Sequence, residues 1–122
     1  MILVDSFGWI EYLSGGPLAD KYEKYFSKLE EVFTPTIVFY EVYKKIKTTL
    51  GEEKALLVIA QMMKTDVVPL DSETALSAAE LSLRYSLPMA DAIVYATGMH
   101  KKCPIVTSDP HFKNLEEVIF LK

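Results

Sequence analysis

The sequence predicts an α/β fold in which a parallel β-sheet is covered by helices on both faces. Short, mainly apolar segments alternate along the chain with longer segments of helical periodicity. This alternation is typical of parallel sheets, whose strands are buried on both faces. With 122 residues and 50% hydrophobic content, the chain is long enough for one domain with a substantial core and too short for two. We therefore expect residues 1–122 to form a single domain.

Five short segments are predicted to be strands. The first, Ile2–Val4, is apolar and ends directly at Asp5. The others are expected at residues 31–34, 67–70, 104–107 and 118–121. The segment at 104–107 is followed at once by Ser108 and Asp109, so that two of the predicted strands lead into an aspartate.

Six helices are predicted between the strands, followed by one helical turn. Ser6 is expected to cap the first helix, and Pro88 suits the first turn of the last one. Gly15-Gly16-Pro17 separates the first two helices, and Gly51 ends the third. The expected ranges are 6–13, 18–29, 36–50, 52–63, 72–85 and 88–100, with the helical turn at 109–112.

Four acidic residues are expected to meet at one edge of the sheet. Asp5 and Asp109 follow the carboxyl ends of predicted strands, where open parallel sheets bind their ligands. Asp91 lies in the first turn of its helix, where the macrodipole favours negative charge. Glu41 lies about a turn and a half into a helix that follows another strand. These positions allow the four carboxylates to converge.

A converging set of carboxylates suggests a divalent metal site. Hard cations such as Mg²⁺ and Mn²⁺ prefer oxygen ligands, and they can activate water for attack on a phosphodiester. The net charge of −4, from 13 basic and 17 acidic residues, argues against a protein that holds nucleic acid mainly by neutralising phosphates. A nuclease with this composition would therefore take its positive charge from metal ions.

Each acid taken alone also has a purely structural interpretation. Asp5 could cap a helix, Asp91 could satisfy a helix N-terminus, Asp109 could initiate a turn, and Glu41 could be solvated. The last interpretation is the weakest, because an unpaired carboxylate on an apolar helical face is costly. The apolar neighbours of Glu41 on that helix are Ile37, Val38 and Val42.

The chain resembles the PIN-domain superfamily and, within it, the VapC-type toxin ribonucleases of toxin–antitoxin pairs. The resemblance covers nearly the whole chain and rests on four motifs. These are Val4-Asp5-Ser6 with residues 9–13, Thr34-Pro35 with Glu41, Pro88-Met89-Ala90-Asp91-Ala92-Ile93 with Ala96-Thr97, and Val106-Thr107-Ser108-Asp109 with Phe112. The last two motifs are the specific ones.

The resemblance implies a metal-dependent endoribonuclease with a five-stranded parallel sheet of order 3-2-1-4-5. It implies that four acids bind Mg²⁺ or Mn²⁺, namely Asp5, Glu41, Asp91 and Asp109. Ser6 and Thr107 are expected to support the site, the latter by holding the fourth acid. Some relatives carry a further acid shortly after the fourth, whereas no acid follows here until Glu116, which leaves the number of metal ions open.

The resemblance also implies an RNA substrate, a homodimer and a cognate antitoxin. The many aromatic residues favour a dimer as well, because a small domain with this content can leave an apolar patch exposed. Lys44 and Lys45 lie near Glu41 on the same helix and are candidates for contact with the RNA backbone, with a solvated basic face as the alternative. His111 could contact phosphate, but as a loop histidine without a visible partner it is expected to be incidental.

Four other functions remain alternatives. An RNA-processing nuclease of the same fold would lack an antitoxin, and a degenerate binding module would have lost the site, although all four acids are present. A receiver domain fits poorly because it needs paired acids after the first strand, where Ser6 and Phe7 follow Asp5. A haloacid-dehalogenase-type phosphatase fits poorly too, because it needs an aspartate at position 7.

The sequence also suggests where the protein works. No apolar run approaches the roughly 18–20 residues of a membrane span, and no secretory signal precedes Asp5, so we expect a cytoplasmic protein. Cys103 is the only cysteine, which excludes an internal disulfide, and we expect it to be a buried thiol.

Overall fold

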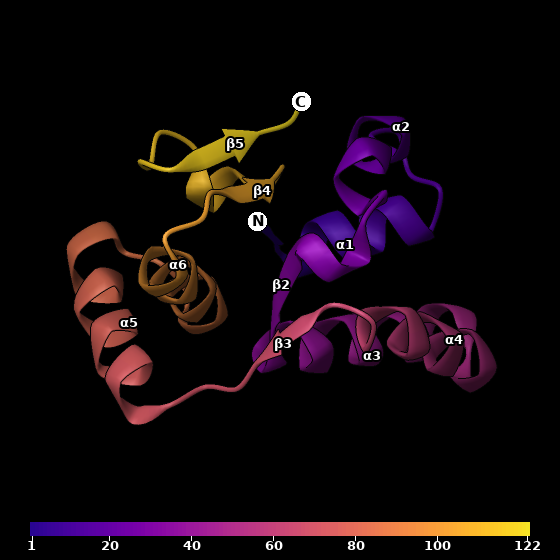
Figure 1. Cartoon of the computed structure of the whole chain (residues 1–122), viewed down its shortest axis with the longest axis horizontal. Coiled ribbons are helices and arrows are strands. Elements are labelled where there is room, and N and C mark those ends of the chain that lie inside the picture. The colour runs from indigo at the N-terminus through magenta and orange to yellow at the C-terminus, as the bar shows by residue number, and fades with distance from the viewer.

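A computed structural model describes residues 1–122 and shows a sheet between two groups of helices (Figure 1). The strands are β1 (Ile2–Val4), β2 (Val32–Pro35), β3 (Asp66–Val68), β4 (Ile105–Thr107) and β5 (Val118–Phe120). The α-helices are α1 (Ser6–Leu13), α2 (Ala19–Tyr22), α3 (Thr36–Leu50), α4 (Glu52–Met62), α5 (Ser72–Tyr85) and α6 (Met89–Lys101). Three short 3₁₀ helices complete the chain: η1 (Glu23–Phe26), η2 (Leu29–Glu31) and η3 (Pro110–Phe112).

The five strands form one parallel sheet in the order β3-β2-β1-β4-β5. This result confirms the predicted fold class and strand order. The central strand β1 pairs with β2 through Leu3 and Phe33, and with β4 through Val4 and Val106. Receiver domains have the order 2-1-3-4-5 instead, so the topology excludes that alternative.

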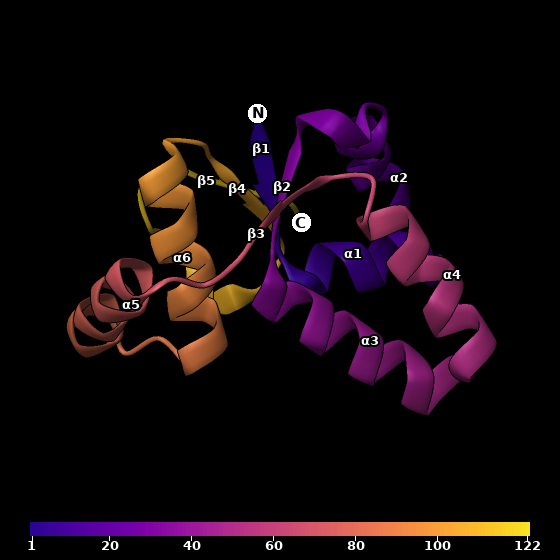
Figure 2. The same ribbon diagram turned by 60° about the horizontal axis from the view of Figure 1, so that its bottom comes forward.

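The direction of the strand order reverses at β1, and this reversal puts the helices on two sides. Helices α5 and α6 pack together on one side of the sheet, and α1 to α4 lie on the other side (Figure 2). Helix α3 also contacts α6, so the two groups of helices meet beyond one edge of the sheet. Ligand sites of open α/β sheets form at such a reversal, beyond the carboxyl ends of the strands.

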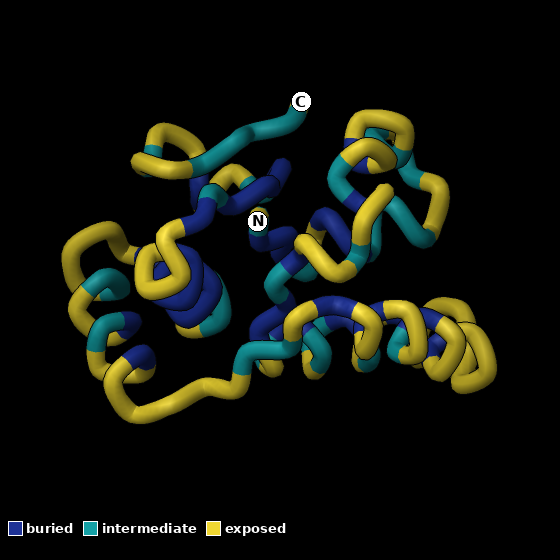
Figure 3. The backbone as a smooth tube through the Cα atoms, in the orientation of Figure 1, coloured by how far each residue is buried: buried dark blue, intermediate teal, exposed yellow.

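The core extends from the sheet into the adjacent helices. Most residues of β1 and the central part of α6 are buried, whereas the outer faces of α4 and α5 are exposed (Figure 3). Seven consecutive residues of α6, positions 92–98, are buried, because this helix lies between α5 and the sheet. Burial of these central residues fixes the position of the helix, and with it the first turn that carries Asp91.

Some local predictions are wrong, one over a whole segment and the others at helix starts. The helix expected over 18–29 is interrupted, since α2 passes into η1 at Glu23, and Lys28 has an extended backbone with φ −130° and ψ 92°. The apolar spacing that suggested a continuous helix has another cause: Phe26 packs against Trp9 and Tyr12, at ring-centroid distances of 4.5 and 4.6 Å. Aromatic contacts across elements therefore set this segment, rather than helical periodicity.

The other errors concern the starts of two helices. Ser6 is the first residue of α1, and Asp5 is its N-cap, with a side chain that accepts a hydrogen bond from the N–H of Gly8. Pro88 likewise is the N-cap of α6 rather than part of its first turn. The other elements begin and end within about two residues of the predicted limits, which is the usual uncertainty of such boundaries.

None of the helices combines the length and the apolar character needed to cross a bilayer.

Candidate active site

The four acids that the sequence singled out lie at the carboxyl edge of the sheet. Asp5 follows β1 directly, and Asp109 follows β4 by two residues. Asp91 lies in the first turn of α6, and Glu41 is the sixth residue of α3. The charge of Asp109 raises the pKa of each of the other three carboxyl groups. All four side chains therefore belong to one electrostatically coupled group.

Asp5 is the most buried member of the group, with 3% of its surface exposed. Its Oδ1 accepts the N–H of Gly8 at 2.9 Å, and its Oδ2 accepts the hydroxyl of Thr107 at 2.6 Å. Burial raises the pKa of Asp5 to about 7, and the charges of Asp109 and Asp91 act in the same direction. The two hydrogen bonds lower the pKa but do not offset the burial. Asp5 is thus both a helix cap and a carboxyl group whose ionisation is disfavoured by its surroundings.

Gly8 is needed for this arrangement. A Cβ atom at position 8 would lie 2.5 Å from Cγ1 of Val4 and 2.6 Å from Cε1 of Tyr22. Contacts this short do not occur, so any larger residue would displace the first turn of α1. Because the N–H of Gly8 holds Oδ1 of Asp5, that displacement would reach the carboxylate as well.

Thr107 connects the first and the fourth acid. Its hydroxyl donates to Asp5 and accepts the backbone N–H of Asp109 at 3.0 Å. A hydroxyl has one proton to donate, and here it is directed at the carboxylate. Thr107 is fully buried, so neither contact is exposed to competition from water. The hydroxyl therefore joins the ends of β1 and β4 at the site.

A buried pair of hydroxyl groups supports the same edge. The hydroxyl groups of Tyr22 and Ser108 are 2.5 Å apart, and Ser108 lies between Thr107 and Asp109. Burial raises the pKa of Tyr22 above its usual range, so its phenol stays protonated. The sequence did not single out Tyr22 as part of the site, because only the fold brings it to β4.

Asp91 and Asp109 are partly buried, with 16% and 19% of their side chains exposed. Burial raises the pKa of Asp91 to about 6, and the charge of Asp109 adds to this effect. The neighbouring His111 lowers it in part. Two carboxylates therefore face each other with one imidazole as their nearest basic group.

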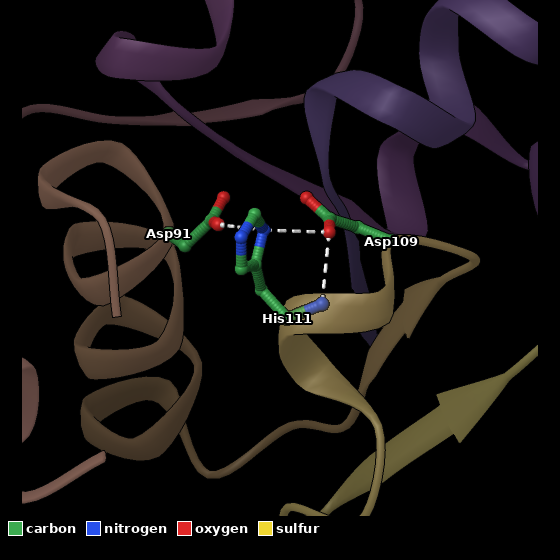
Figure 4. Close-up of side chains that lie close together, drawn as sticks. All are labelled: Asp91, Asp109 and His111. Atoms are coloured by element: carbon green, nitrogen blue, oxygen red, sulfur yellow. Dashed lines mark hydrogen bonds and ion pairs between the residues drawn. The ribbon is translucent and has the colours of Figure 1, made fainter. Parts of the chain in front are cut away.

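His111 lies between these two carboxylates (Figure 4). Its Nδ1 is 3.1 Å from Oδ2 of Asp91 and 2.9 Å from Oδ1 of Asp109. The sequence suggested that this histidine is incidental, and the structure corrects that expectation. The available signal was the spacing Asp109-Pro110-His111: an aspartate that caps a turn holds the residue two positions later, here through the N–H of His111 at 2.9 Å.

Glu41 approaches the group from the other side of the sheet. Burial raises the pKa of Glu41, the charge of Asp109 raises it further, and the hydroxyl of Ser6 opposes both. Ser6 thus faces Glu41 rather than capping α1. The neighbours of Glu41 on the buried face of α3 are Val38 and Val42, as the apolar pattern predicted.

Lys44 and Lys45 are exposed on α3 beside Glu41. Both border a depression that Tyr40, Glu41 and Thr48 also line. Lys45 borders a second depression, together with Ser6 and Glu11. The ammonium group of Lys44 lies 5.5 Å from the ring centroid of Tyr40. Neither lysine is paired with an acid in the structure, so both charges are available to a ligand.

The site has a strong excess of negative charge. Four carboxylates face one imidazole, and the pKa values of three of them are raised. Carboxylate oxygens are the ligands that hard divalent cations prefer, and Asp91, Asp109 and His111 each offer a ligand atom within 4.8 Å of the others. The residues present therefore fit a divalent metal ion.

Comparison with solved structures shows folds that are similar over nearly the whole chain. A toxin–antitoxin complex from Klebsiella pneumoniae contains a chain that is 19% identical and has a TM-score of 0.81; the match covers 98% of this chain and 96% of that chain. VapC20 of Mycobacterium tuberculosis, described as a sarcin-ricin loop cleaving toxin, is 19% identical with a TM-score of 0.73, and 84% of each chain is covered. VapBC2 of Rickettsia felis, bound to a promoter DNA fragment, is 14% identical with a TM-score of 0.77 and coverages of 99% and 98%.

The sequence itself was compared with family models and with curated proteins. Among curated proteins, none matches the chain. The model of the PIN domain matches residues 2–118, which is almost the entire chain. This match confirms the resemblance seen in the motifs, and the chain belongs to the PIN-domain family.

Proposed function

We propose that this chain is a metal-dependent endoribonuclease that hydrolyses RNA phosphodiester bonds, with residues 1–122 acting as one domain. The observation that carries the proposal is the coupled group of four carboxylates at the carboxyl edge of the sheet. Asp5 and Asp91 have pKa values raised to about 7 and about 6. Groups so perturbed and so close together are typical of functional sites.

A purely structural role explains this group poorly. Helix capping accounts for one oxygen of Asp5 and one of Asp109, but it does not require Asp91 and Glu41 to approach them. Mutual repulsion of ionised carboxylates costs stability in the free protein. A cation that neutralises them would offset this cost, and we infer that Asp5, Glu41, Asp91 and Asp109 bind Mg²⁺ or Mn²⁺.

Hydrolysis requires a water oxygen to attack phosphorus while the bond from phosphorus to the leaving oxygen breaks and that oxygen takes up a proton. A divalent cation would lower the pKa of the attacking water and stabilise the charge on the leaving oxygen. Asp5, Glu41, Asp91 and Asp109 would hold and orient this cation. Thr107 keeps Asp5 and Asp109 in register, and Lys44 and Lys45 bind the RNA backbone beside Glu41.

We further propose that the protein is the toxin of a toxin–antitoxin pair and forms a homodimer. The similar structures include a toxin–antitoxin complex. They also include a DNA-bound VapBC assembly from Salmonella typhimurium, which has 13% identity and a TM-score of 0.76. Exposed leucines on α4 and α5 offer apolar surface for partners. An RNA-processing nuclease without an antitoxin is the alternative, and a short upstream reading frame whose product co-purifies with this chain would favour the toxin.

Cleavage of a single-stranded RNA, and of a structured RNA with an exposed loop, tests the catalytic proposal. The purified protein should cut with Mg²⁺ or Mn²⁺ and should be inactive in chelator. Asp5→Asn, Asp91→Asn and Asp109→Asn should each abolish cutting, while Asp66→Asn, an exposed aspartate on the edge strand β3, should not. Cleavage that persists in chelator, or in any two of the three site variants, would reject the mechanism.

A further inference from the structure

His111 has a fixed place in the acidic group. Its backbone N–H donates to Oδ1 of Asp109, and its ring nitrogen Nδ1 lies 2.9 Å from that same oxygen and 3.1 Å from Oδ2 of Asp91. The short helix η3 holds the backbone, so the ring leaves the chain already directed at the two carboxylates (Figure 4). Three potential ligand atoms thus converge from two elements, α6 and η3 with its cap.

The spacing of these atoms matches that of neighbouring ligands on one ion. An octahedral cation with ligands at about 2.1 Å separates adjacent ligand atoms by ~3.0 Å. The two distances from Nδ1 are close to this value, and all three atoms lie within 4.8 Å of one another. Imidazole binds metals through an unprotonated ring nitrogen, so an ion could bind where Nδ1 faces the two carboxylates.

We propose that His111 is a protein ligand of the metal ion, and that its nitrogen shifts the selectivity of the site from Mg²⁺ toward transition-metal ions. Carboxylate oxygen suits Mg²⁺ and Mn²⁺ alike, whereas imidazole nitrogen favours transition metals, increasingly along the series from Mn²⁺ to Ni²⁺. The inference deepens the proposed function and rests on its metal site. It concerns this chain's own donor set, in which the two residues after Asp109 are Pro110 and His111.

The opposite role for His111 makes a different prediction. As a positively charged counter-ion, the ring would relieve the repulsion between Asp91 and Asp109 without binding the metal. An incoming cation would then compete with His111, and removal of the ring would tighten binding of every divalent metal. Removing His111 would therefore weaken metal binding if it is a ligand and strengthen metal binding if it is a competitor.

Calorimetric titration of untagged protein at one fixed pH, with Mg²⁺, Mn²⁺ and Ni²⁺ in turn, tests the proposal. His111→Ala should weaken Ni²⁺ binding most, by an order of magnitude or more, Mn²⁺ binding by less, and Mg²⁺ binding least. His100→Ala is the matched control, since His100 is the only other histidine and lies near the far end of α6, bonded to Thr74. It should leave all three affinities unchanged.

Pulsed electron paramagnetic resonance of bound Mn²⁺ gives a second test that does not depend on measuring a binding affinity. Wild type and the His100→Ala variant should show coupling of the manganese to a directly bound imidazole ¹⁴N, and His111→Ala should lose it. Because the wild-type spectrum alone reports the nitrogen, the test holds even where the variant is poorly folded. Circular dichroism of His111→Ala monitors folding in parallel.

The proposal is overturned if wild type shows no nitrogen coupling, if His111→Ala changes the three affinities by the same factor, or if it tightens them. These outcomes are separable from failure of the proposed function. If the protein binds Mn²⁺ through His111 but cleaves no RNA, the proposed ribonuclease activity is refuted and the role of His111 as a metal ligand is supported. If the protein cleaves RNA and His111→Ala leaves the ratios of the three metal affinities unchanged, the ribonuclease is supported and His111 is refuted as a ligand.

Discussion

The hydroxyl of Thr107 donates a hydrogen bond of 2.6 Å to the carboxylate of Asp5, which lies 102 positions earlier in the chain. The same hydroxyl accepts the N–H of Asp109. One side-chain oxygen thus connects the two strand ends on which the site is built. It also holds down the pKa of Asp5, which burial alone would raise further.

Replacing Thr107 with valine tests this connection. Thr107→Val keeps the shape of the side chain but leaves Oδ2 of Asp5 and the N–H of Asp109 without their partner. Unsatisfied buried groups of this kind cost roughly 1–3 kcal/mol each, and a charged one costs more. We expect a lower free energy of unfolding in urea and weaker metal binding.

Thr97→Val is the matched control. Thr97 is buried in α6, and its hydroxyl donates only to the carbonyl of Ile93 in the preceding helical turn. That carbonyl accepts a backbone hydrogen bond in any case, so we expect a loss of less than about 1 kcal/mol. Equal losses of unfolding free energy in the two variants would show that the hydrogen bonds of Thr107 contribute no more to stability than that of Thr97.

The stability of the metal-free protein should fall as the pH rises. Asp5 and Asp91 have folded-state pKa values of about 7 and about 6, above their usual values. A raised folded-state pKa favours folding while the group is protonated, below its unfolded pKa near 4, and this stabilisation is lost as the pH passes through the folded-state pKa. Urea unfolding in chelator should give a drop of roughly 2–4 kcal/mol between pH 4.5 and 8. A flat or rising profile would contradict it.

Asp91→Asn should raise the melting temperature of the metal-free protein at pH 7.5 while abolishing RNA cleavage. The substitution removes a partly buried charge that repels Asp109 and keeps nearly the same shape, for a gain of about 1 kcal/mol. Millimolar Mg²⁺ should stabilise wild type and affect the variant much less. Thermal melts of wild type, Asp91→Asn and the exposed control Asp66→Asn, with chelator and with Mg²⁺, decide the point. A less stable Asp91→Asn with an unchanged magnesium response would mean that the acids do not share a site.

A homodimer is expected at micromolar concentration. Leu76 and Leu83 are 71% and 82% exposed, and seven residues apart on α5 they share one face of the helix. The chain has a mass of 13.8 kDa, and light scattering should give twice this value. Leu76→Lys combined with Leu83→Lys should give the monomer, whereas Leu50→Lys, at the exposed end of α3, is the control and should leave the dimer intact. A monomeric wild type would reject the dimer.

Much of this site could be predicted because its members lie at ends of regular elements. Asp5 ends an apolar strand, Asp109 follows another, and Asp91 opens a helix, so parallel topology alone brings them to one edge. Glu41 was recognisable because a carboxylate interrupts the apolar face of α3. The strand order followed from the family motifs, since local patterns carry no information on which strands become neighbours.

The features that escaped prediction depend on irregular backbone or on distant contacts. His111 reaches the acids through a turn that Asp109 caps, and a loop sequence does not reveal where such a side chain points. Tyr22 meets Ser108 across 86 positions. The break after α2 arises because Phe26 packs on Trp9, which a local periodicity cannot anticipate.

The contact between Thr107 and Asp5 also bears on when the acidic site forms during synthesis of the chain. A ribosome delivers Asp5 early and β4 about a hundred residues later, so a partly made chain carries its first acid without the strand that completes the site. Since β4 pairs with β1, the carboxylates assemble only after residues 105–109 have emerged and folded onto the sheet. A nascent chain that ends before β4 therefore lacks the assembled acidic site on which the proposed RNA cleavage depends.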